Sequence, residues 1–241
     1  MEVLKTENVS RTFGAVLAVD QLSFALGAGE IMGFLGTNGA GKTTTIKMLL
    51  GLIRPSAGTV RVLGGDPADP EVRRRIGYMP EVAYYYPYLS ARELLAFYGG
   101  LCGLDSKTIR VRTDELLERV GLADAAKRPL KTYSKGMLQR AGIAQALLAD
   151  PALLILDEPF TGLDPLARIQ FRELMRSLRE AGKTIFFSSH ELGETELLCD
   201  RVAIMKRGRC LYNGPVKRLA GDGGVNLERL FLEVLEKGGV E

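Results

Sequence analysis

A glycine-rich stretch, GTNGAGKT at residues 36–43, constrains the fold more than any other part of this sequence. It fits the pattern G-x-x-x-x-G-K-[ST], and it follows an apolar, strand-like segment, LSFALGAGEIMGFLG at residues 22–36. The next residues, KTTTIKMLLGL, have the apolar spacing of a helix that ends at Gly51. A strand, a glycine loop and a helix in this order form a βα unit, which favours a parallel sheet. We therefore predict an α/β fold with this loop at the end of a parallel strand.

The composition of this loop suits the binding of a polyphosphate. Several negative charges need closely spaced backbone N–H donors, and glycines let the chain wrap near enough to present them. The start of the following helix adds the positive end of its dipole, Lys42 adds a point charge for the β and γ phosphates, and the Thr43 hydroxyl can bind Mg²⁺. We expect a nucleotide to be bound by Gly36, Asn38, Gly39, Gly41, Lys42, Thr43 and Thr44.

A second run, LLILDE at residues 153–158, places two acids at the end of a buried strand. Asp157 could hold the magnesium through its water shell, and Glu158 could polarise a water towards the γ phosphate. Adjacent acids at a strand end can also form a solvated turn. Because the glycine loop already predicts a nucleotide, we favour the catalytic interpretation.

The order of the predicted elements divides the chain into a core and an insertion. Strand-like segments surround the glycine loop and return at ALLILD and KTIFFSS, whereas residues 83–149 have a helical pattern. Within that stretch, Ser90 and Glu93 fit a capping box, TDELLERVGL ends at a glycine, and MLQRAGIAQALLAD is a further helical segment. We therefore expect a nucleotide-binding core made of residues 1–82 and 150–220, interrupted by a helical subdomain.

Apolar residues near the C-terminus have the spacing of one more helix. The positions i, i+3, i+4, i+7 and i+8 are filled by Leu227, Leu230, Phe231, Val234 and Leu235. We expect an amphipathic helix within residues 221–241 that folds back on the core.

Charge and hydropathy exclude several kinds of partner. The 241 residues include 32 Lys and Arg against 29 Asp and Glu, and the net charge of +3 is too small to indicate a nucleic acid or a membrane surface. The N-terminal MEVLKTENVSRTF has no apolar stretch resembling a signal peptide. Apolar runs such as LLIL at residues 153–156 fall far short of the roughly 18 residues that span a bilayer. Any membrane association is therefore expected to come through a partner, and the three cysteines, which lack metal-ligand spacing, are expected to be reduced thiols.

Three further motifs give the sequence a resemblance to a known family. YSKGMLQR at residues 133–140 precedes LLILDEP, TGLD follows at residues 161–164, and FFSSHEL at residues 186–192 contains the only histidine. The chain resembles, over nearly its whole length, the nucleotide-binding subunit of ATP-binding cassette (ABC) transporters. The resemblance implies a P-loop NTPase core with a mainly parallel sheet flanked by helices, an antiparallel β subdomain near the N-terminus and an inserted helical subdomain. It also implies that His190, which alone would be read as an ordinary structural group, contacts the γ phosphate.

In this family two subunits sandwich two ATP molecules, so the resemblance implies a dimer with a second copy or with a sibling cassette. Ser134 and Gly136, at the start of a helix, would bind the γ phosphate that the opposite subunit's loop holds. Asp164 would reach across the interface, Glu158 would act as general base or water-orienting group, and hydrolysis would release the dimer. The catalytic residues implied are Lys42, Glu158 and His190.

Several positions depart from the commonest family pattern. Glu81 stands where many members have glutamine, a variant that resembles the exporter branch, and its carboxylate can still bind Mg²⁺ or accept from water. Lys135, Met137 and Thr37 replace a glycine, a glutamine and a proline, with no essential donor lost. Phe13 matches the aromatic that stacks on adenine, with a core position as the alternative. The implied metal ligands are Thr43, Asp157 and Glu81.

Four of the eight tyrosines gather in YYYPY at residues 84–88. Exposed tyrosine clusters favour interfaces, and the resemblance places this stretch where a membrane-spanning permease docks. We therefore expect permease contacts near Tyr84, Tyr85, Tyr86 and Tyr88, with packing of the helical subdomain as the alternative.

These observations predict an ATPase subunit, with ATP and Mg²⁺ as cofactors, that powers a separate permease at the cytoplasmic face of the membrane and is expected to be part of an exporter. The alternative is a soluble ABC ATPase that acts on ribosomes or DNA. Such relatives usually carry two cassettes or a long coiled coil, and neither is visible in this sequence, so no nucleic-acid partner is expected. A non-hydrolysing ATP-binding regulator is disfavoured by the intact Lys42, Asp157, Glu158 and His190.

Overall fold

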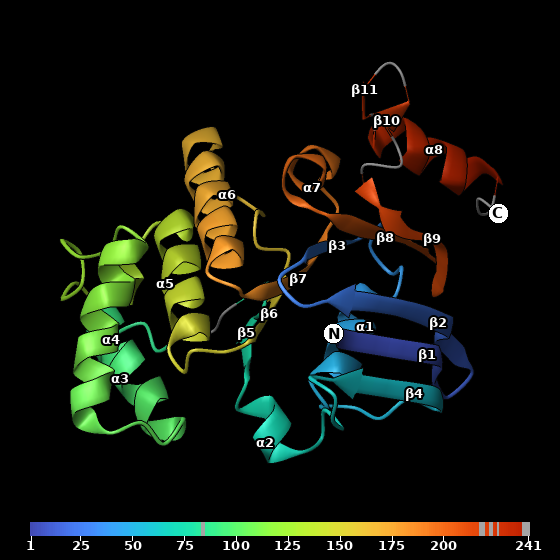
Figure 1. Cartoon of the computed structure of the whole chain (residues 1–241). Coiled ribbons are helices and arrows are strands. Elements are labelled where there is room, and N and C mark those ends of the chain that lie inside the picture. Colours follow the sequence, from blue (N-terminus) through green and yellow to red (C-terminus); the bar gives the residue numbers. More distant parts are fainter. Residues whose placement is uncertain (83–84, 217–219, 222–223, 226, 238–241) are drawn as a thin grey trace.

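The computed structural model describes residues 1–82, 85–216, 220–221, 224–225 and 227–237, and its central element is a six-stranded sheet (Figure 1). The strands lie in the order β5 (Ile76–Met79), β6 (Leu153–Asp157), β7 (Thr184–Ser189), β3 (Ile31–Gly36), β8 (Arg201–Lys206) and β9 (Arg209–Pro215). All neighbouring pairs run parallel except β8 and β9. The carboxyl ends of β3, β6 and β7 therefore meet at one edge of the sheet, where ligands of open α/β sheets bind.

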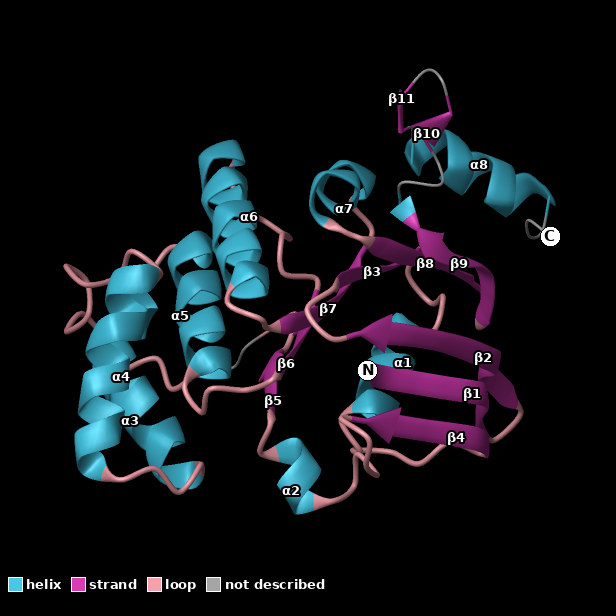
Figure 2. Ribbon diagram, in the orientation of Figure 1, coloured by secondary structure: helices cyan, strands magenta, loops and turns pink. Residues whose placement is uncertain are grey.

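A second sheet of three antiparallel strands packs against this core (Figure 2). Its strands are β2 (Val16–Gly27), β1 (Glu2–Phe13) and β4 (Ala57–Val62), in that order. Phe24 of β2 packs against Phe34 of β3 and Phe186 of β7, with ring centroids 5.3 to 5.8 Å apart. All three side chains are buried, and each contributes about 1.5–3 kcal/mol by leaving water. This shared aromatic cluster fixes the antiparallel sheet beside the glycine loop.

The apolar stretch at residues 22–36, predicted as one strand segment, forms parts of two strands in different sheets. β2 ends at Gly27 and β3 begins at Ile31. The turn between them contains Gly29 at a φ of 74°, and the Glu30 carboxylate accepts a hydrogen bond of 2.8 Å from the Gly27 N–H. The prediction was wrong because a left-handed glycine ends the strand ladder at this point.

Helices α3 (Ala91–Leu101), α4 (Ser106–Arg119) and α5 (Lys135–Leu147) form the end of the molecule opposite the antiparallel sheet (Figure 1). The capping box at the start of α3 is confirmed, since the Ser90 hydroxyl accepts from the Glu93 N–H and the Glu93 carboxylate accepts from the Ser90 N–H at 2.8 Å.

Helix α4 is longer than the TDELLERVGL pattern predicts. Asp105 caps its start, because one carboxylate oxygen accepts from the N–H groups of Lys107 and Thr108, both at 3.0 Å. An aspartate directly before a serine was the available signal, and the apolar pattern alone did not extend that far.

The remaining helices flank the sheet or lie at the C-terminal end of the chain. They are α1 (Lys42–Leu49), α2 (Pro70–Arg73), α6 (Pro165–Glu180), α7 (Leu192–Leu198), α8 (Leu227–Lys237) and the 3₁₀ turn η1 (Leu130–Thr132). The two short strands β10 (Ala220–Gly221) and β11 (Gly224–Val225) precede α8. The helix predicted near the C-terminus is α8, which buries Leu227 and Val234 and contacts α7 and β9. Within the described part of the chain, no helix is both long enough and apolar enough to cross a membrane.

Candidate functional site

Strand β3 delivers the chain into the glycine loop at the carboxyl edge of the sheet, and α1 (Lys42–Leu49) leaves it. Gly41, the residue before α1, has a φ of 104°, and a Cβ there would lie 2.7 Å from the backbone oxygen of Ala18. Only glycine is compatible with this position. Because Gly41 also has no side chain to cap the helix, the first N–H groups of α1 are available to an anion.

Lys42 is the cation at the centre of the loop. Its side chain is only 7% exposed, its ammonium donates to the Gly36 carbonyl at 2.6 Å, and it lies 3.1 Å from Glu158 Oε1. This buried ammonium thus has one carbonyl and one carboxylate as partners, and Glu158 balances its charge.

Two neighbouring acids end β6, as the LLILDE run predicts. Asp157 Oδ1 accepts a 2.5 Å hydrogen bond from the Ser188 hydroxyl, and that hydroxyl in turn accepts from the Glu158 N–H at 2.9 Å. Glu158 has a φ of 49°, an uncommon conformation for a residue other than glycine. Burial raises the pKa of Asp157 above its ordinary value, while the Ser188 hydrogen bond lowers it and the charges of Glu81 and Glu158 raise it further.

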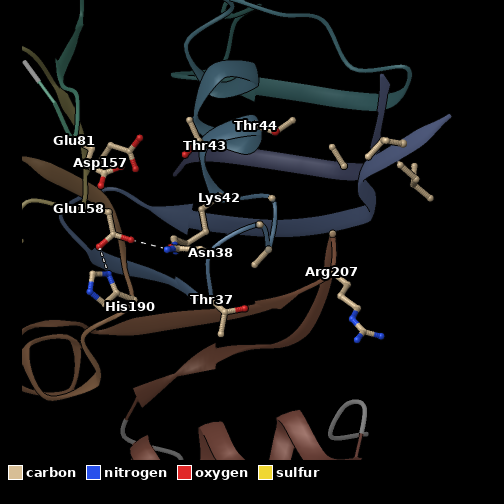
Figure 3. Close-up of a pocket in the computed structure, with 17 residues that line it drawn as sticks. Thr37, Asn38, Lys42, Thr43, Thr44, Glu81, Asp157, Glu158, His190 and Arg207 are labelled. Atoms are coloured by element: carbon tan, nitrogen blue, oxygen red, sulfur yellow. Dashed lines mark hydrogen bonds and ion pairs between the residues drawn. The ribbon is translucent and has the colours of Figure 1, made fainter. Parts of the chain in front are cut away.

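His190 follows β7 and completes this cluster. Its Nδ1 lies 2.8 Å from Glu158 Oε2, so the two oxygens of Glu158 face Lys42 on one side and His190 on the other (Figure 3). The imidazole side chain is 52% exposed, whereas Glu158 is buried. The histidine therefore forms the open side of the cluster.

These groups line a cavity of about 720 Å³, large enough for a nucleotide. Among the residues predicted to bind a nucleotide or to act on it, the cavity is lined by Asn38, Gly39, Gly41, Lys42, Thr43, Thr44, Glu81, Asp157, Glu158 and His190. Gly36 does not line it, but its carbonyl holds Lys42. The sequence thus identified most of the cavity wall.

The predicted magnesium ligands fit such an ion. Thr43, Asp157 and Glu81 all line the cavity, and Glu81 is close enough to Asp157 to raise its pKa. A divalent cation between these oxygens would relieve their mutual repulsion. Among the described residues there is no cluster of three or more His, Cys, Asp and Glu side chains that could hold a metal ion.

Besides Gly36, four predicted nucleotide contacts are not among the cavity-lining residues. Phe13 ends β1, is 45% exposed, and has the Arg11 guanidinium 4.5 Å from its ring centroid. Ser134 caps α5 by accepting from the Met137 N–H at 3.2 Å, and Gly136 lies in the first turn of that helix. The fourth residue is Asp164, which caps α6 by accepting from the Ala167 N–H at 2.8 Å.

The tyrosine stretch has two faces. Tyr84 lies outside the described residues. Tyr85 is packed against the core, burial raises the pKa of its phenol, and its hydroxyl is buried without a hydrogen-bond partner among the described residues. Tyr86 and Tyr88 are 58% and 77% exposed, and Tyr86 makes an edge contact with Phe97 of α3.

The sequence analysis missed one residue that orients the acids and several residues that line the cavity. Ser188, which orients both acids, directly precedes the SH pair of FFSSHEL, and its position beside the histidine was an available signal. The cavity is also lined by Val16, Leu17, Ala18, Thr37, Ala40, Arg207 and Gly208. Gly208, in the turn between β8 and β9, donates to the Ala40 carbonyl at 3.0 Å and accepts from the Asp20 N–H at 2.8 Å. No local sequence pattern around residue 208 predicts this long-range contact.

Comparison with known proteins identifies the family of this chain. A family profile described as ABC transporter matches residues 19–161. An uncharacterised ABC transporter ATP-binding protein of Nostoc is 49% identical over 208 residues, which are 86% of this chain and 62% of that protein. Nod factor export ATP-binding protein I of Burkholderia lata is 43% identical over 210 residues, which are 86% of this chain and 69% of that protein. The chain therefore spans less than two thirds of the length of the Nostoc relative.

Solved structures give the same result for the fold. A structure described as the ATP binding subunit of an ABC transporter superposes with a TM-score of 0.86 at 33% identity, covering 97% of this chain and 99% of that one. The likeness confirms the predicted fold class, a P-loop NTPase core with an antiparallel sheet and added helices.

Proposed function

The chain belongs to the ABC transporter family, and on that premise we propose that it binds ATP in the cavity beside the glycine loop and hydrolyses it to drive transport. The observation that carries the proposal is the contact of one buried carboxylate, Glu158, with both Lys42 and His190. A general base must lie within hydrogen-bond reach of the reacting group, and here it lies between the phosphate-binding lysine and a histidine at the open side.

The residues divide the reaction between them. Lys42 leaves Gly36 and Glu158 to contact the β and γ phosphates, which frees Glu158 Oε1 to accept a hydrogen bond from water. The water oxygen bonds to the γ phosphorus, a water proton passes to Glu158, and the bond from the γ phosphorus to the bridging oxygen breaks to give ADP and phosphate. His190 holds the γ phosphate and the water in line.

Magnesium would supply charge stabilisation to the phosphates when bound. Thr43, Asp157 and Glu81 would hold it through their oxygens, and Ser188 keeps Asp157 oriented towards the cavity. Phe13 is proposed as the adenine platform, which requires its ring to turn from Arg11 towards the cavity.

A dimer accounts for the predicted residues that lie away from the cavity. Ser134 is exposed at the start of α5 and Asp164 is exposed at the start of α6, so both can meet a second subunit. We propose that Ser134 and Gly136 bind the γ phosphate held by the opposite chain, and that Asp164 crosses the interface. The partner is a second copy or a sibling cassette.

A separate permease is the proposed membrane partner, contacted by the exposed Tyr86 and Tyr88. In this proposal the helical subdomain, residues 83–149, moves with the permease against the core formed by residues 1–82 and 150–220, and residues 221–241 contain the amphipathic helix α8. The name of the Burkholderia relative supports an exporter, and the protein would then lie at the cytoplasmic face of the membrane through its permease. The small net charge gives no support to a nucleic-acid partner.

The variant Glu158→Gln tests the proposal. We expect it to bind ATP, to accumulate as a dimer in ATP and Mg²⁺, and to release phosphate at least about 100-fold more slowly than the wild-type chain, because a positioned base is lost. The matched control is Glu115→Gln, an exposed glutamate of α4. Phosphate release from Glu158→Gln at the wild-type rate would exclude Glu158 as the base, and absence of ATP hydrolysis by the wild-type chain would exclude the function itself.

A further inference from the structure

One face of helix α6 carries a row of arginines that bind the segment after His190. They occupy positions i, i+4, i+8 and i+11, which share one side of a helix. This arginine row consists of Arg168, Arg172, Arg176 and Arg179. Each of the four donates to an oxygen between residues 191 and 200, so α6 and the segment that contains α7 are joined along their length.

Arg168, the first arginine of the row, makes three side-chain hydrogen bonds. Arg168 uses two N–H groups to bind both carboxylate oxygens of Glu191, one of them at 2.9 Å, and its Nε donates to the Leu163 carbonyl at 3.1 Å. Glu191 is the chain neighbour of His190. A bidentate guanidinium–carboxylate pair fixes orientation as well as distance, so the Glu191 side chain is held in one arrangement.

The other three members fasten the remainder of the segment. Arg172 binds Glu194 at 2.6 Å in a pair that is only 16% and 12% exposed. The next two bonds run from Arg176 to the Leu197 carbonyl at 3.0 Å and from Arg179 to Asp200 at 3.1 Å. Of the four side chains, only Arg168 contacts both the residue beside His190 and the loop before α6.

That loop contains the residue proposed to meet the opposite subunit. Asp164 caps α6 through the Ala167 N–H, and the backbone N–H of Arg168 donates to the Asp164 carbonyl at 3.0 Å. The Arg168 side chain adds the bond to Leu163. A displacement of residues 161–164 must therefore be carried to the Arg168 guanidinium, and through Glu191 to His190.

We propose that Arg168 is a positioning residue that sets the contact between His190 and Glu158 according to the position of the 161–164 loop. The inference rests on the proposed function, since it assigns regulation to the same ATPase site. His190 Nδ1 lies 2.8 Å from Glu158 when the Arg168–Glu191 pair is formed. A second subunit that engages Asp164 thereby adjusts the group that holds the attacking water, and one chain gains its full hydrolytic rate only against a correctly seated partner.

A purely structural role for Arg168 makes a different prediction. If the pair served only to hold α6 against α7, then the Arg172–Glu194 pair, which is more buried, would matter at least as much. Loss of either pair would lower stability, and the catalytic rate would follow stability. If Arg168 positions His190, loss of its pair should lower the catalytic rate without a matching loss of stability.

The test compares Arg168→Gln with Arg172→Gln in the purified full-length chain, with kcat, KM for ATP and melting temperature measured for both. We expect Arg168→Gln to lower kcat about tenfold with KM changed less than about twofold, since a displacement on the order of 1 Å in a reacting group can cost up to about 100-fold. Arg172→Gln should lower the melting temperature at least as much, with kcat changed less than about twofold. Equal effects of the two substitutions on kcat would overturn the proposal.

A charge exchange gives a second readout that does not depend on stability. The double variant Arg168→Glu with Glu191→Arg can re-form the ion pair, and it should recover at least about threefold of the kcat lost by Arg168→Glu alone. No recovery, with the double variant as stable as Arg172→Gln, would also overturn the proposal. Failure of the proposed function is distinguishable, because then the wild-type chain would not hydrolyse ATP and Glu158→Gln would have no rate to lower.

Discussion

Removal of the Ser188 hydroxyl should disturb stability and catalysis together. Ser188 is fully buried at the end of β7, donates to Asp157 at 2.5 Å and accepts from the Glu158 N–H at 2.9 Å. Its one oxygen atom therefore fixes the side chain of one acid and the backbone of the next. The substitution Ser188→Ala removes both bonds and leaves the strand otherwise unchanged.

The two lost bonds set the size of the effect. A hydrogen bond to a charged group contributes about 1.5–3 kcal/mol, and a buried N–H left without a partner costs about 1–3 kcal/mol. Because the two effects overlap in one network, we expect Ser188→Ala to lower the free energy of unfolding by about 2–4 kcal/mol at neutral pH. The left-handed backbone of Glu158 then has one restraint fewer, so kcat for ATP should fall about tenfold.

The loss of stability should depend on pH in a defined direction. Burial raises the folded-state pKa of Asp157 above its ordinary value of 3.8, so this carboxyl favours folding most at acidic pH, and that contribution is lost as the pH rises through the folded pKa. The Ser188 bond opposes the rise by stabilising the carboxylate. Without it the pKa of Asp157 rises further, and the difference in stability between variant and wild type grows from pH 4 towards neutrality.

Urea unfolding at several pH values measures the loss of stability and its pH dependence, and phosphate release measured in parallel gives the change in kcat. Ser177→Ala is a suitable control, because Ser177 on α6 donates to the Leu174 carbonyl far along the chain from the acids. It should cost less than about 1.5 kcal/mol and leave kcat unchanged. A Ser188→Ala chain whose loss of stability is the same at pH 4 and pH 7 would refute the assignment of this hydroxyl to the Asp157 carboxylate.

Two further outcomes are expected. His190→Ala should lower kcat at least about tenfold with little change in ATP affinity, and normal turnover would return this histidine to a structural role. Tyr86→Ala combined with Tyr88→Ala should weaken co-purification with the permease from detergent-solubilised membranes, because both side chains are exposed, while ATP hydrolysis by the isolated chain persists. Tyr85 is left intact because it packs against the core. An unchanged yield of permease would show that the docking surface lies elsewhere.

The cavity edge of the sheet could be predicted from the sequence because each of its motifs is a short, continuous run of residues. Each motif follows a strand: GTNGAGKT follows β3, the acids end β6, and His190 follows β7. Parallel strands bring their carboxyl ends to the same edge, so three separate sequence signals converge without any knowledge of side-chain contacts. The local patterns pointed to Lys42, Asp157 and Glu158, the family resemblance added His190, and all four line one cavity.

The parts that escaped prediction depend on contacts between distant segments. The turn at Gly208 reaches the glycine loop through Ala40, and Val16 and Leu17 line the cavity from the end of an antiparallel hairpin. Neither segment carries a pattern of its own. The position of Phe13 beside Arg11 is likewise a packing outcome, since an aromatic at a strand end can turn towards either neighbour.

In the proposed function, the contacts of Glu158 would place ATP binding before hydrolysis. One oxygen lies 3.1 Å from Lys42 Nζ and the other lies 2.8 Å from His190 Nδ1, so each oxygen already has one partner. In this proposal a triphosphate in the loop would attract Lys42 away from the first oxygen, and Arg168 would set how closely His190 approaches the second. Nucleotide and partner loop would then each act on a different neighbour of Glu158, and this single side chain would link hydrolysis to assembly.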